Sequence, residues 1–461
     1  MFLIIKAFIY CSIIEQLRKS FQVRAQMPKK DYKNQIKKKI ISKKAVIGIV
    51  GLGYAGLPLA LLFAKKNFCV NGFDIDKNKI RKIKKGHSYI NRIKDEQIKI
   101  LKKKGSFFSS FENINKCDII IICVPTPLKK NEEPELRFIK ESFLSIKNNL
   151  RKGQTIVLES TSYPGTTKDI FINQLKDNFS IGKEIYIGFS SERINPGFNE
   201  NTISNVPKVV SGFTKNCLDI ISMYYSSVFK KVIKCKKIEV AEFSKLLENI
   251  YRSVNIGFIN EMKFVADKMN IDIFEIIKIA RTKPFGFRPY HPGPGIGGHC
   301  IPIDPNYLSW KAKKIGVNTS FIKLSTKVNL KVLSFLKKKI FNILKEKKIK
   351  ASKAKILILG VAYKRNIDDI RESASIKLIN ALIKKNIKVS FSDPHVKILE
   401  AINYNKKLKG IYLRPQRIKN FDLVILMTDH NKFNYKMIYK YSKLIIDCRG
   451  RYNVNHKVIR S

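Results

Sequence analysis

Cys300 is a single thiol surrounded by glycines and prolines in the stretch PGPGIGGHCIPIDPNYL, residues 292–308. Glycine and proline disfavour regular helices and strands, so we expect a loop whose backbone can close tightly around a ligand. A thiol in such a loop can add to a carbonyl carbon and form a covalent adduct. Asp304, four residues on, can serve as a base or orient a water molecule. The residues alone are equally consistent with a buried structural thiol.

Lys245 and Asn249 form a second candidate group, in a segment whose apolar residues repeat with helical period. Residues four apart share a helix face, so the two side chains can converge on one substrate atom. An ammonium and an amide together can stabilise an oxyanion. From spacing alone, however, two polar side chains pointing to solvent are the commoner outcome.

Three further polar residues follow apolar runs that we interpret as buried strands. Thr126 follows CDIIIICVP, Glu159 follows QTIVL, and Glu192 follows EIYIGFSS. Polar residues at strand ends are well placed for ligands, because ligands of parallel sheets bind at the carboxyl ends of the strands. Either glutamate could order a water molecule, although each residue taken singly carries little information.

A glycine-rich turn follows the apolar run 46–50 and opens an apolar helical stretch. Gly51 permits the tight turn, Gly53 lets the backbone approach a pyrophosphate, and Gly56 lets the helix pack closely. The helix N-terminus attracts the phosphate charge. Asp74 ends the next predicted strand, 18 positions after the last glycine (74 − 56). This β-α-β context indicates a dinucleotide site, against the alternative of a tight turn without a ligand.

NAD is the cofactor that this turn favours. The Asp74 carboxylate can accept hydrogen bonds from a ribose diol and would repel a 2′-phosphate, so it disfavours NADP. Nearby lysines, including Lys79, weaken that preference. Tyr54 and Ala55 occupy the turn between the glycines, and we count them with Lys79 among the expected cofactor contacts.

The elements that must position these residues predict an α/β fold with two Rossmann-like, doubly wound domains joined by a long central helix. Residues 45–238 form the first domain, and 239–350 form a helical domain with the cysteine loop. From residue 351 to 461 the strand–helix theme restarts, but only GVAYK stands where a full glycine motif would be. This second Rossmann-like unit is therefore expected to bind something other than a dinucleotide in that way. The proline-free run 239–270 predicts one or two long helices, which are also a candidate dimer surface.

The composition sets the remaining limits. The chain has 461 residues and a formal net charge of +54, but its lysines are spread along the chain, which favours composition bias over a nucleic-acid surface. The eight cysteines include no C-x-x-C pair, so we expect free thiols in a reducing, cytoplasmic compartment and no metal site. We interpret residues 1–44 as a basic, poorly structured N-terminal extension, with at most a weak membrane-surface helix. No firm membrane association is expected of the main body.

Taken together, the motifs identify a family. GLGYAGLPLA, VPTP, ESTSYPGTT, SSERINPG, EFSKLLEN, GPGIGGHCIPIDP and GVAYKRNIDDIRES occur in this order between residues 46 and 449. This pattern resembles the NAD-dependent nucleotide-sugar 6-dehydrogenases, the UDP-glucose/GDP-mannose dehydrogenase family. The cysteine loop is most similar to UDP-N-acetylglucosamine 6-dehydrogenases of surface-polysaccharide pathways, since UDP-glucose dehydrogenases usually carry another residue before the cysteine.

The resemblance implies a four-electron oxidation of a sugar C6 alcohol to a carboxylate with two NAD. Cys300 matches the nucleophile that forms a thiohemiacetal and then a thioester. Lys245 and Asn249 match the oxyanion-stabilising pair, Asp304 the acid/base, and Glu192 with Thr126 the residues that hold the catalytic water. The remaining matched positions lie at the ligands: Gly297 in the loop that closes on the sugar, and Lys364 and Arg371 in the UDP-binding C-terminal domain, with Arg371 reaching the cofactor.

Some positions depart from the family pattern. Pro196 stands where UDP-glucose dehydrogenases often have a second glutamate, which argues against that subgroup. Arg365 replaces a frequent proline, and the segment after Asn329 lacks the usual Met-Pro. UDP-glucose and UDP-GalNAc remain alternative substrates. A basic nucleic-acid-binding Rossmann protein and a pathway scaffold that has lost activity are alternatives of another class, although no helix-turn-helix or RNA-reading motif supports the former.

Overall fold

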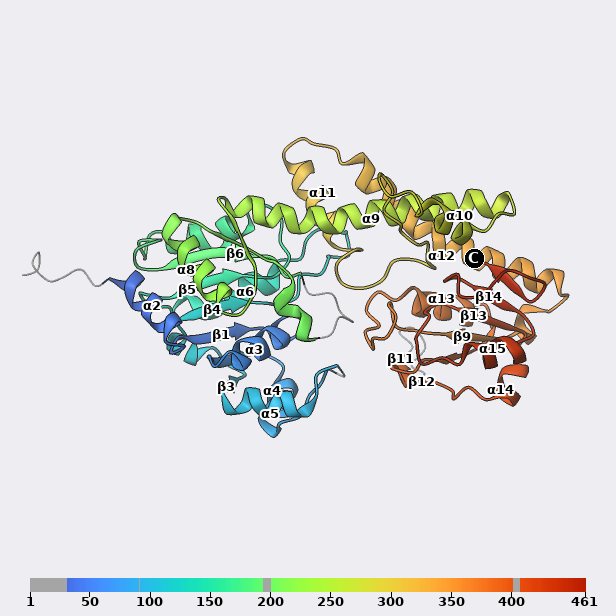
Figure 1. The fold of residues 1–461 in the computed structure, drawn as a ribbon, viewed down its shortest axis with the longest axis horizontal. Coiled ribbons are helices and arrows are strands. Elements are labelled where there is room, and N and C mark those ends of the chain that lie inside the picture. Colours follow the sequence, from blue (N-terminus) through green and yellow to red (C-terminus); the bar gives the residue numbers. More distant parts are fainter. Residues whose placement is uncertain (1–30, 91, 194–199, 401–406) are drawn as a thin grey trace, which may run out of the picture.

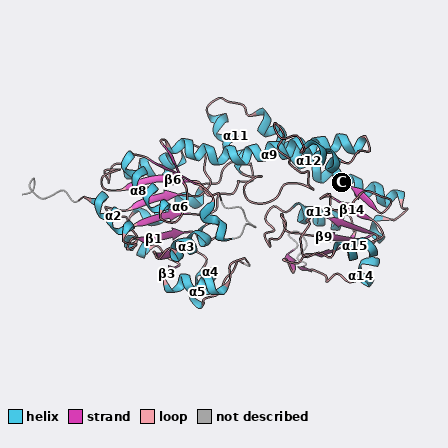
Figure 2. Ribbon diagram, viewed as in Figure 1, coloured by secondary structure: helices cyan, strands magenta, loops and turns pink. Residues whose placement is uncertain are grey.

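The computed structural model describes residues 31–461 except 91, 194–199 and 401–406. Two α/β domains lie at the two ends of an elongated molecule, and a long helix runs along both (Figure 1). Figure 2 shows that each domain has a central sheet with helices on both faces. The predicted fold class is therefore confirmed. Pro196 and residues 1–30 of the expected extension lie outside the described residues.

The first domain is built on an eight-stranded sheet in the order β3-β2-β1-β4-β5-β6-β7-β8. All neighbouring strands are parallel except β6 and β7, which are antiparallel. The inner strands β4, β5, β6 and β7 are buried along their whole length, as a parallel sheet covered by helices requires, whereas the edge strand β8 is partly exposed. The strands are β1 (Val46–Val50), β2 (Cys69–Phe73), β3 (Gly105–Phe108), β4 (Ile119–Ile122), β5 (Thr155–Leu158), β6 (Tyr186–Ser190), β7 (Lys208–Gly212) and β8 (Val232–Cys235).

Helices cover both faces of this sheet. They are α3 (Gly56–Lys65), α4 (Lys77–Lys85), α5 (Asp95–Lys103), α6 (Arg137–Lys147), α7 (Asn173–Leu175) and α8 (Lys215–Ser226).

A further helix, α2 (Tyr32–Ile41), precedes β1 and corrects the expectation of a poorly structured extension for this part of the chain. Ile36 and Ile40 are buried in the first core, and Lys39 donates to the buried Asp118 carboxylate at 2.7 Å. Asp118 also accepts from the Val46 amide at 3.0 Å, so α2 is fastened to the amino ends of the strands.

The central helix α9 (Ile238–Lys268) is a single helix of 31 residues, where the run without proline predicted one or two. It packs along α12 (Ser320–Glu346), and the shorter helices α10 (Ile273–Ala280) and α11 (Asp304–Lys314) lie beside it. Asn329, a residue next to a departure from the family pattern, is buried between the two long helices. Its amide donates to the Ser253 carbonyl at 3.2 Å and its oxygen accepts from Asn260 at 2.9 Å.

The second domain has a five-stranded parallel sheet in the order β10-β9-β13-β14-β15. Its strands are β9 (Lys355–Leu359), β10 (Lys388–Ser392), β13 (Leu423–Leu426), β14 (Ile445–Asp447) and β15 (Val458–Arg460), and the hairpin β11 (Ile398–Glu400) with β12 (Lys407–Lys409) stands apart. Its helices are α13 (Ala374–Ile383), α14 (Pro415–Lys419) and α15 (Tyr435–Tyr441). Within the described ranges, no helix combines the length and the apolar character needed to cross a bilayer.

Candidate active site

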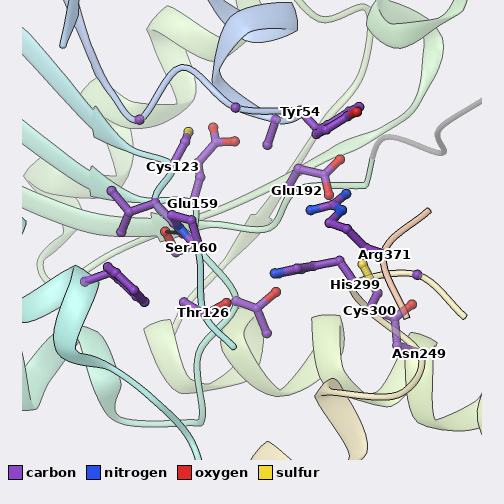
Figure 3. Close-up of a pocket in the computed structure, with 18 of the residues that line it drawn as sticks. Tyr54, Cys123, Thr126, Glu159, Ser160, Glu192, Asn249, His299, Cys300 and Arg371 are labelled. Carbon is purple, nitrogen blue, oxygen red and sulfur yellow. Dashed lines mark hydrogen bonds between the residues drawn. The ribbon is translucent and has the colours of Figure 1, made fainter. Parts of the chain in front are cut away.

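A large cavity of about 1240 Å³ lies where the carboxyl ends of the first sheet, the α9 face, the cysteine loop and the second domain meet. It is lined by most of the residues that the sequence singled out. In Figure 3, Cys300, His299 and Asn249 lie on one side of it, with Cys123, Glu159 and Ser160 on the other. Two predicted residues, Gly56 and Asp304, lie behind its wall.

The glycine turn forms one end of this cavity. Gly51 has a φ of +92°, which only glycine adopts readily, and a Cβ on Gly56 would stand 1.9 Å from the Gly51 carbonyl oxygen. A Cβ on Gly53 would meet no atom within 4 Å, so the backbone there is open to a ligand. Ala55 and Tyr54 line the same end.

Asp74 follows β2, and its carboxylate holds the backbone of the glycine turn by hydrogen bonding. One carboxylate oxygen accepts from the Leu52 amide at 2.9 Å and from Lys79 Nζ at 3.1 Å, and the other accepts from the Asp76 amide at 2.9 Å. Both Asp74 and Lys79 line the cavity. The Lys79 ammonium therefore partly neutralises the negative charge of Asp74, which would repel the 2′-phosphate of NADP.

Tyr54 bridges the two domains through its ring. The Arg371 guanidinium of the second domain lies 4.7 Å from the ring centroid, and Arg92 lies 5.8 Å from it. Arg92 also donates to the Tyr54 carbonyl at 3.0 Å. Arg371 is held in place by Asp369, at 2.7 Å. Two cations thus stand beside the glycine turn, of which only Arg371 was predicted.

The α9 face presents Lys245 and Asn249 to the cavity, and both are buried. Lys245 Nζ donates to the Glu192 carbonyl at 2.5 Å and lies 3.7 Å from the Glu192 carboxylate. Burial disfavours the ammonium, but Glu192, Cys300 and Asp304 outweigh it and raise the pKa of Lys245. The solvent-facing alternative is therefore wrong for this pair.

Asp304 is the first residue of α11, one turn after Cys300, and its amide donates to the Cys300 carbonyl at 2.8 Å. One carboxylate oxygen accepts from Asn249 Nδ2 at 2.6 Å. The other oxygen is buried without a hydrogen-bond partner among the described residues. Burial raises the pKa of Asp304 to about 6, against the opposing effects of Lys245 and Asn249. A carboxyl group with this pKa exchanges a proton readily near neutral pH.

Cys300 lies in the predicted loop, which is packed against the second domain. A Cβ on Gly297 would stand 2.6 Å from Tyr363 Cβ, and the Gly298 amide donates to the Arg371 carbonyl at 3.0 Å. Burial raises the pKa of the Cys300 thiol to about 11, although Lys245 opposes the rise. The thiol is therefore protonated at neutral pH and needs a base when it reacts.

The other predicted residues are placed as follows. Thr126 is buried at the cavity wall, and Glu192 and Lys364 line the cavity. Glu159 lines it too, but both of its carboxylate oxygens have protein partners, Lys208 at 2.8 Å and the Tyr225 hydroxyl. Both Glu159 oxygens are thus occupied by protein groups.

Among the cavity-lining residues that sequence reasoning did not predict are Cys123, Arg252, Tyr363 and Arg449. Cys123 ends an apolar run and is also buried in the first core, so its type and position did not mark it as a site residue. Arg252 could have been found, since it follows Lys245 and Asn249 at positions i+7 and i+3 of the same helix face.

Comparison with known proteins assigns the chain. Three descriptions of the UDP-glucose/GDP-mannose dehydrogenase family match in order, the NAD binding domain at residues 45–230, the central domain at 239–331 and the UDP binding domain at 357–454. The chain belongs to this family. The resemblance inferred from the motifs is confirmed, and the chain is an NAD-dependent nucleotide-sugar dehydrogenase, an oxidoreductase.

Individual relatives cover most of the chain. Protein CapL of Staphylococcus aureus is 33% identical over 88% of this chain and 96% of its own length. The UDP-N-acetyl-D-glucosamine 6-dehydrogenase of Pseudomonas aeruginosa is 33% identical over 78% of this chain and 85% of its own. Among solved structures, the UDP-D-ManNAc dehydrogenase of Pyrococcus horikoshii is 28% identical, with a TM-score of 0.79, covering 90% of this chain and 98% of that one.

The residues present in this family member fit NAD. The open backbone at Gly53 and the Asp74 carboxylate at the end of β2 are the features that a dinucleotide needs. When bound, NAD supplies the hydride acceptor for alcohol oxidation.

Proposed function

We propose that this family member oxidises the C6 alcohol of a UDP-N-acetylhexosamine, foremost UDP-GlcNAc, to the carboxylate with two NAD per sugar. The product would be a precursor of a surface polysaccharide. The observation that carries this proposal is the single cavity shared by the glycine turn, the Lys245–Asn249 face and Cys300. An alcohol bound there meets a hydride acceptor, an oxyanion-stabilising pair and a nucleophile at once.

Cys300 forms the covalent intermediate. Once C6 is at the aldehyde level, Sγ adds to it and gives a thiohemiacetal; removal of a second hydride gives a thioester, which water hydrolyses. Asp304 takes the thiol proton, because its pKa of about 6 leaves it ionised at neutral pH. Lys245 and Asn249 stabilise the negative charge that develops on the C6 oxygen at each stage.

Glu192 and Thr126 hold the water that hydrolyses the thioester. Their support is position, since both line the cavity and Lys245 contacts the Glu192 carbonyl and carboxylate. Gly51, Gly53, Tyr54, Ala55, Gly56, Asp74, Lys79 and Arg371 hold NAD, and Gly297 with Lys364 contacts the nucleotide sugar.

The choice of UDP-GlcNAc rests on the cysteine loop and on relatives that bear this name in two organisms, at 33% and 32% identity. UDP-ManNAc is a second candidate, because a relative of Methanococcus vannielii named UDP-N-acetyl-D-mannosamine dehydrogenase is also 33% identical. UDP-glucose and UDP-GalNAc complete the set to be tested.

The test is a substrate panel with NADH stoichiometry. Each nucleotide sugar is incubated with NAD, and we expect two NADH per UDP-GlcNAc consumed and the highest kcat/KM for that sugar. One NADH per sugar, with an aldehyde or ketone accumulating, would contradict the four-electron reaction. Higher kcat/KM for another sugar would move the assignment to it.

Cys300→Ser isolates the covalent step. We expect NAD binding to be unchanged and production of the uronic acid to be lost. Cys235→Ser is the matched control, since Cys235 is a half-buried free thiol that does not line the cavity. Wild-type turnover in Cys300→Ser would refute the covalent role.

The second face of α9 supports a homo-oligomer. Large apolar side chains on it are 42–56% exposed, namely Val240, Phe243, Leu247, Tyr251, Phe258 and Val265. Their spacing puts them on one side of the helix, away from Lys245 and Asn249. A second copy of this chain is the partner that such a stripe fits, because the same stripe on both copies is self-complementary.

Light scattering after gel filtration tests the oligomer. Leu247→Glu with Phe258→Glu should give a monomer, whereas Leu144→Glu, at an apolar side chain 56% exposed on α6, should leave the oligomer intact. An unchanged mass in the double variant would exclude α9 as the interface. We place the reaction in the cytoplasm, which the seven free thiols of the described residues support.

A further inference from the structure

The turns after β1 and β9 are held in the same way in the two domains. In each, backbone amides of the turn donate to a carboxylate that follows the next strand of the βαβ unit. In the first domain, Asp74 follows β2 and accepts from the Leu52 amide at 2.9 Å. In the second, Asp393 follows β10 and accepts from the amides of Val361 and Ala362 at 2.7 and 3.2 Å. The turn after β9 thus corresponds to the dinucleotide turn after β1.

The two carboxylates differ in what faces them. Asp74 lines the cavity, where a ribose can reach it. Asp393 faces His430, whose Nε2 lies 3.0 Å from Asp393 Oδ2, and both side chains are 0% exposed. The Asp393 carboxylate is thus paired with His430, is buried and does not line the cavity.

His430 also holds the far end of the same segment. Its Nδ1 accepts from the Asn366 amide at 3.0 Å, so the ring proton is on Nε2 and is donated to Asp393. Asn366 has a φ of +62°, and its side-chain oxygen accepts from the Asn431 amide at 2.9 Å. Asparagine is among the non-glycine residues that adopt this left-handed conformation most readily, and the two contacts hold Asn366 there.

The buried Asp393–His430 pair therefore holds the segment 361–366 at both ends by hydrogen bonds to its backbone amides. Asp393 accepts at the start of the segment and His430 at its end. Tyr363 and Lys364 lie between these two hydrogen-bonded positions, and both line the cavity. Tyr363 also lies against the cysteine loop, since its Cβ is 2.6 Å from the Cβ position of Gly297. Displacing the segment would move both side chains and the support of that loop.

We propose that the buried His430–Asp393 pair is a positioning element that holds Tyr363 and Lys364 at the nucleotide-sugar end of the cavity. This inference rests on the proposed function, in which Lys364 contacts the nucleotide sugar. His430 does not line the cavity. It acts through the backbone of the segment.

Calorimetric titration of the full chain with UDP, and separately with NAD, tests the proposal. His430→Leu leaves the Asn366 amide without an acceptor, and we expect UDP binding about tenfold weaker with NAD affinity within about twofold of wild type. His430→Asn restores an acceptor near the Nδ1 position and should recover UDP affinity to within about threefold. His430→Gln restores only the donor to Asp393 and should stay weak.

His395→Leu is the matched control. The His395 ring lies 5.1 Å from that of His430, and within the described residues no hydrogen bond joins its side chain to the segment. We expect wild-type UDP affinity. If His430→Leu is insoluble, the comparison of the Asn and Gln variants decides. Wild-type UDP affinity in His430→Leu, equal affinities in the Asn and Gln variants, or an equal loss of NAD binding would overturn the inference alone. A wild-type protein that binds no UDP would refute the proposed function itself.

Discussion

The hydrogen bond from Asn249 to Asp304 should set the acid limit of catalysis. Asn249 Nδ2 lies 2.6 Å from the carboxylate, and both residues are buried. The bond stabilises the ionised form and lowers the pKa of Asp304, which burial has raised to about 6. If ionised Asp304 is the base, log(kcat/KM) should fall below about pH 6 with a slope of one.

Asn249→Ala removes that donor. A hydrogen bond to a charged group contributes about 1.5–3 kcal/mol, and one pKa unit corresponds to about 1.4 kcal/mol. The pKa of Asp304 should therefore rise by about one to two units, because the carboxylate loses the hydrogen bond that stabilised it relative to the protonated form. The acid limb should move from about pH 6 to between about pH 7 and 8.

The assay is initial NADH formation from pH 5 to 9 at limiting nucleotide sugar. Asn249→Ala should also lower kcat/KM at every pH. A uniform loss of rate does not change the pH at which kcat/KM begins to fall, so the two effects can be measured separately. Asn255→Ala is the control, because Asn255 lies on the same helix, is half-buried, and donates to the Tyr251 carbonyl away from the site. An acid limb at the same pH in wild type and Asn249→Ala would refute this assignment of Asp304.

Three more predictions concern single residues around the cavity. Burial raises the pKa of Asp304 from 3.8 to about 6, so the folded protein loses stability as the pH rises through this range. The shift of about two units corresponds to about 3 kcal/mol of unfolding free energy. Asp304→Asn should therefore raise the unfolding midpoint in calorimetry at pH 8 but not at pH 4. An equal change at both pH values would contradict the burial argument. Asp74→Ser removes the charge that opposes a 2′-phosphate and leaves Lys79, so the ratio of kcat/KM for NADP to that for NAD should rise by about tenfold or more; a constant ratio would count against that role. Gly297→Ala places a Cβ 2.6 Å from Tyr363 Cβ, so UDP affinity should fall by about tenfold or more, and unchanged affinity would mean that the loop can shift freely.

Local features of this protein were predictable from sequence because short-range chemistry determines them. The glycine turn needs residues with special backbone freedom at fixed spacing, and Asp74 follows one strand later. The helical character of α9 follows from an unbroken helical period without proline, although that period left one helix or two open. The shared helix face of Lys245 and Asn249 follows from that same period.

Long-range contacts were not predictable from one sequence. Nothing in the residues near Asn249 indicates that it pairs with Asp304, 55 positions away. The docking of α2 depends on a buried carboxylate, Asp118, that lies 79 positions after Lys39. The contact of Arg371 with the Tyr54 ring depends on how the second domain faces the first. Such contacts are fixed by packing, which composition and period do not encode.

The central helix α9 has a consequence for how the chain can vary in length. Asn249 faces the cavity from one part of the helix, while Asn260 anchors α12 and thereby the second domain from another. One residue inserted between them would rotate everything beyond by about 100° and advance it by about 1.5 Å. Four inserted residues restore the angle to within about 40° but lengthen the molecule by about 6 Å, so no insertion restores both. The helix therefore fixes the rotational phase between cofactor and nucleotide-sugar domains, and length variation has to fall in the loops outside it.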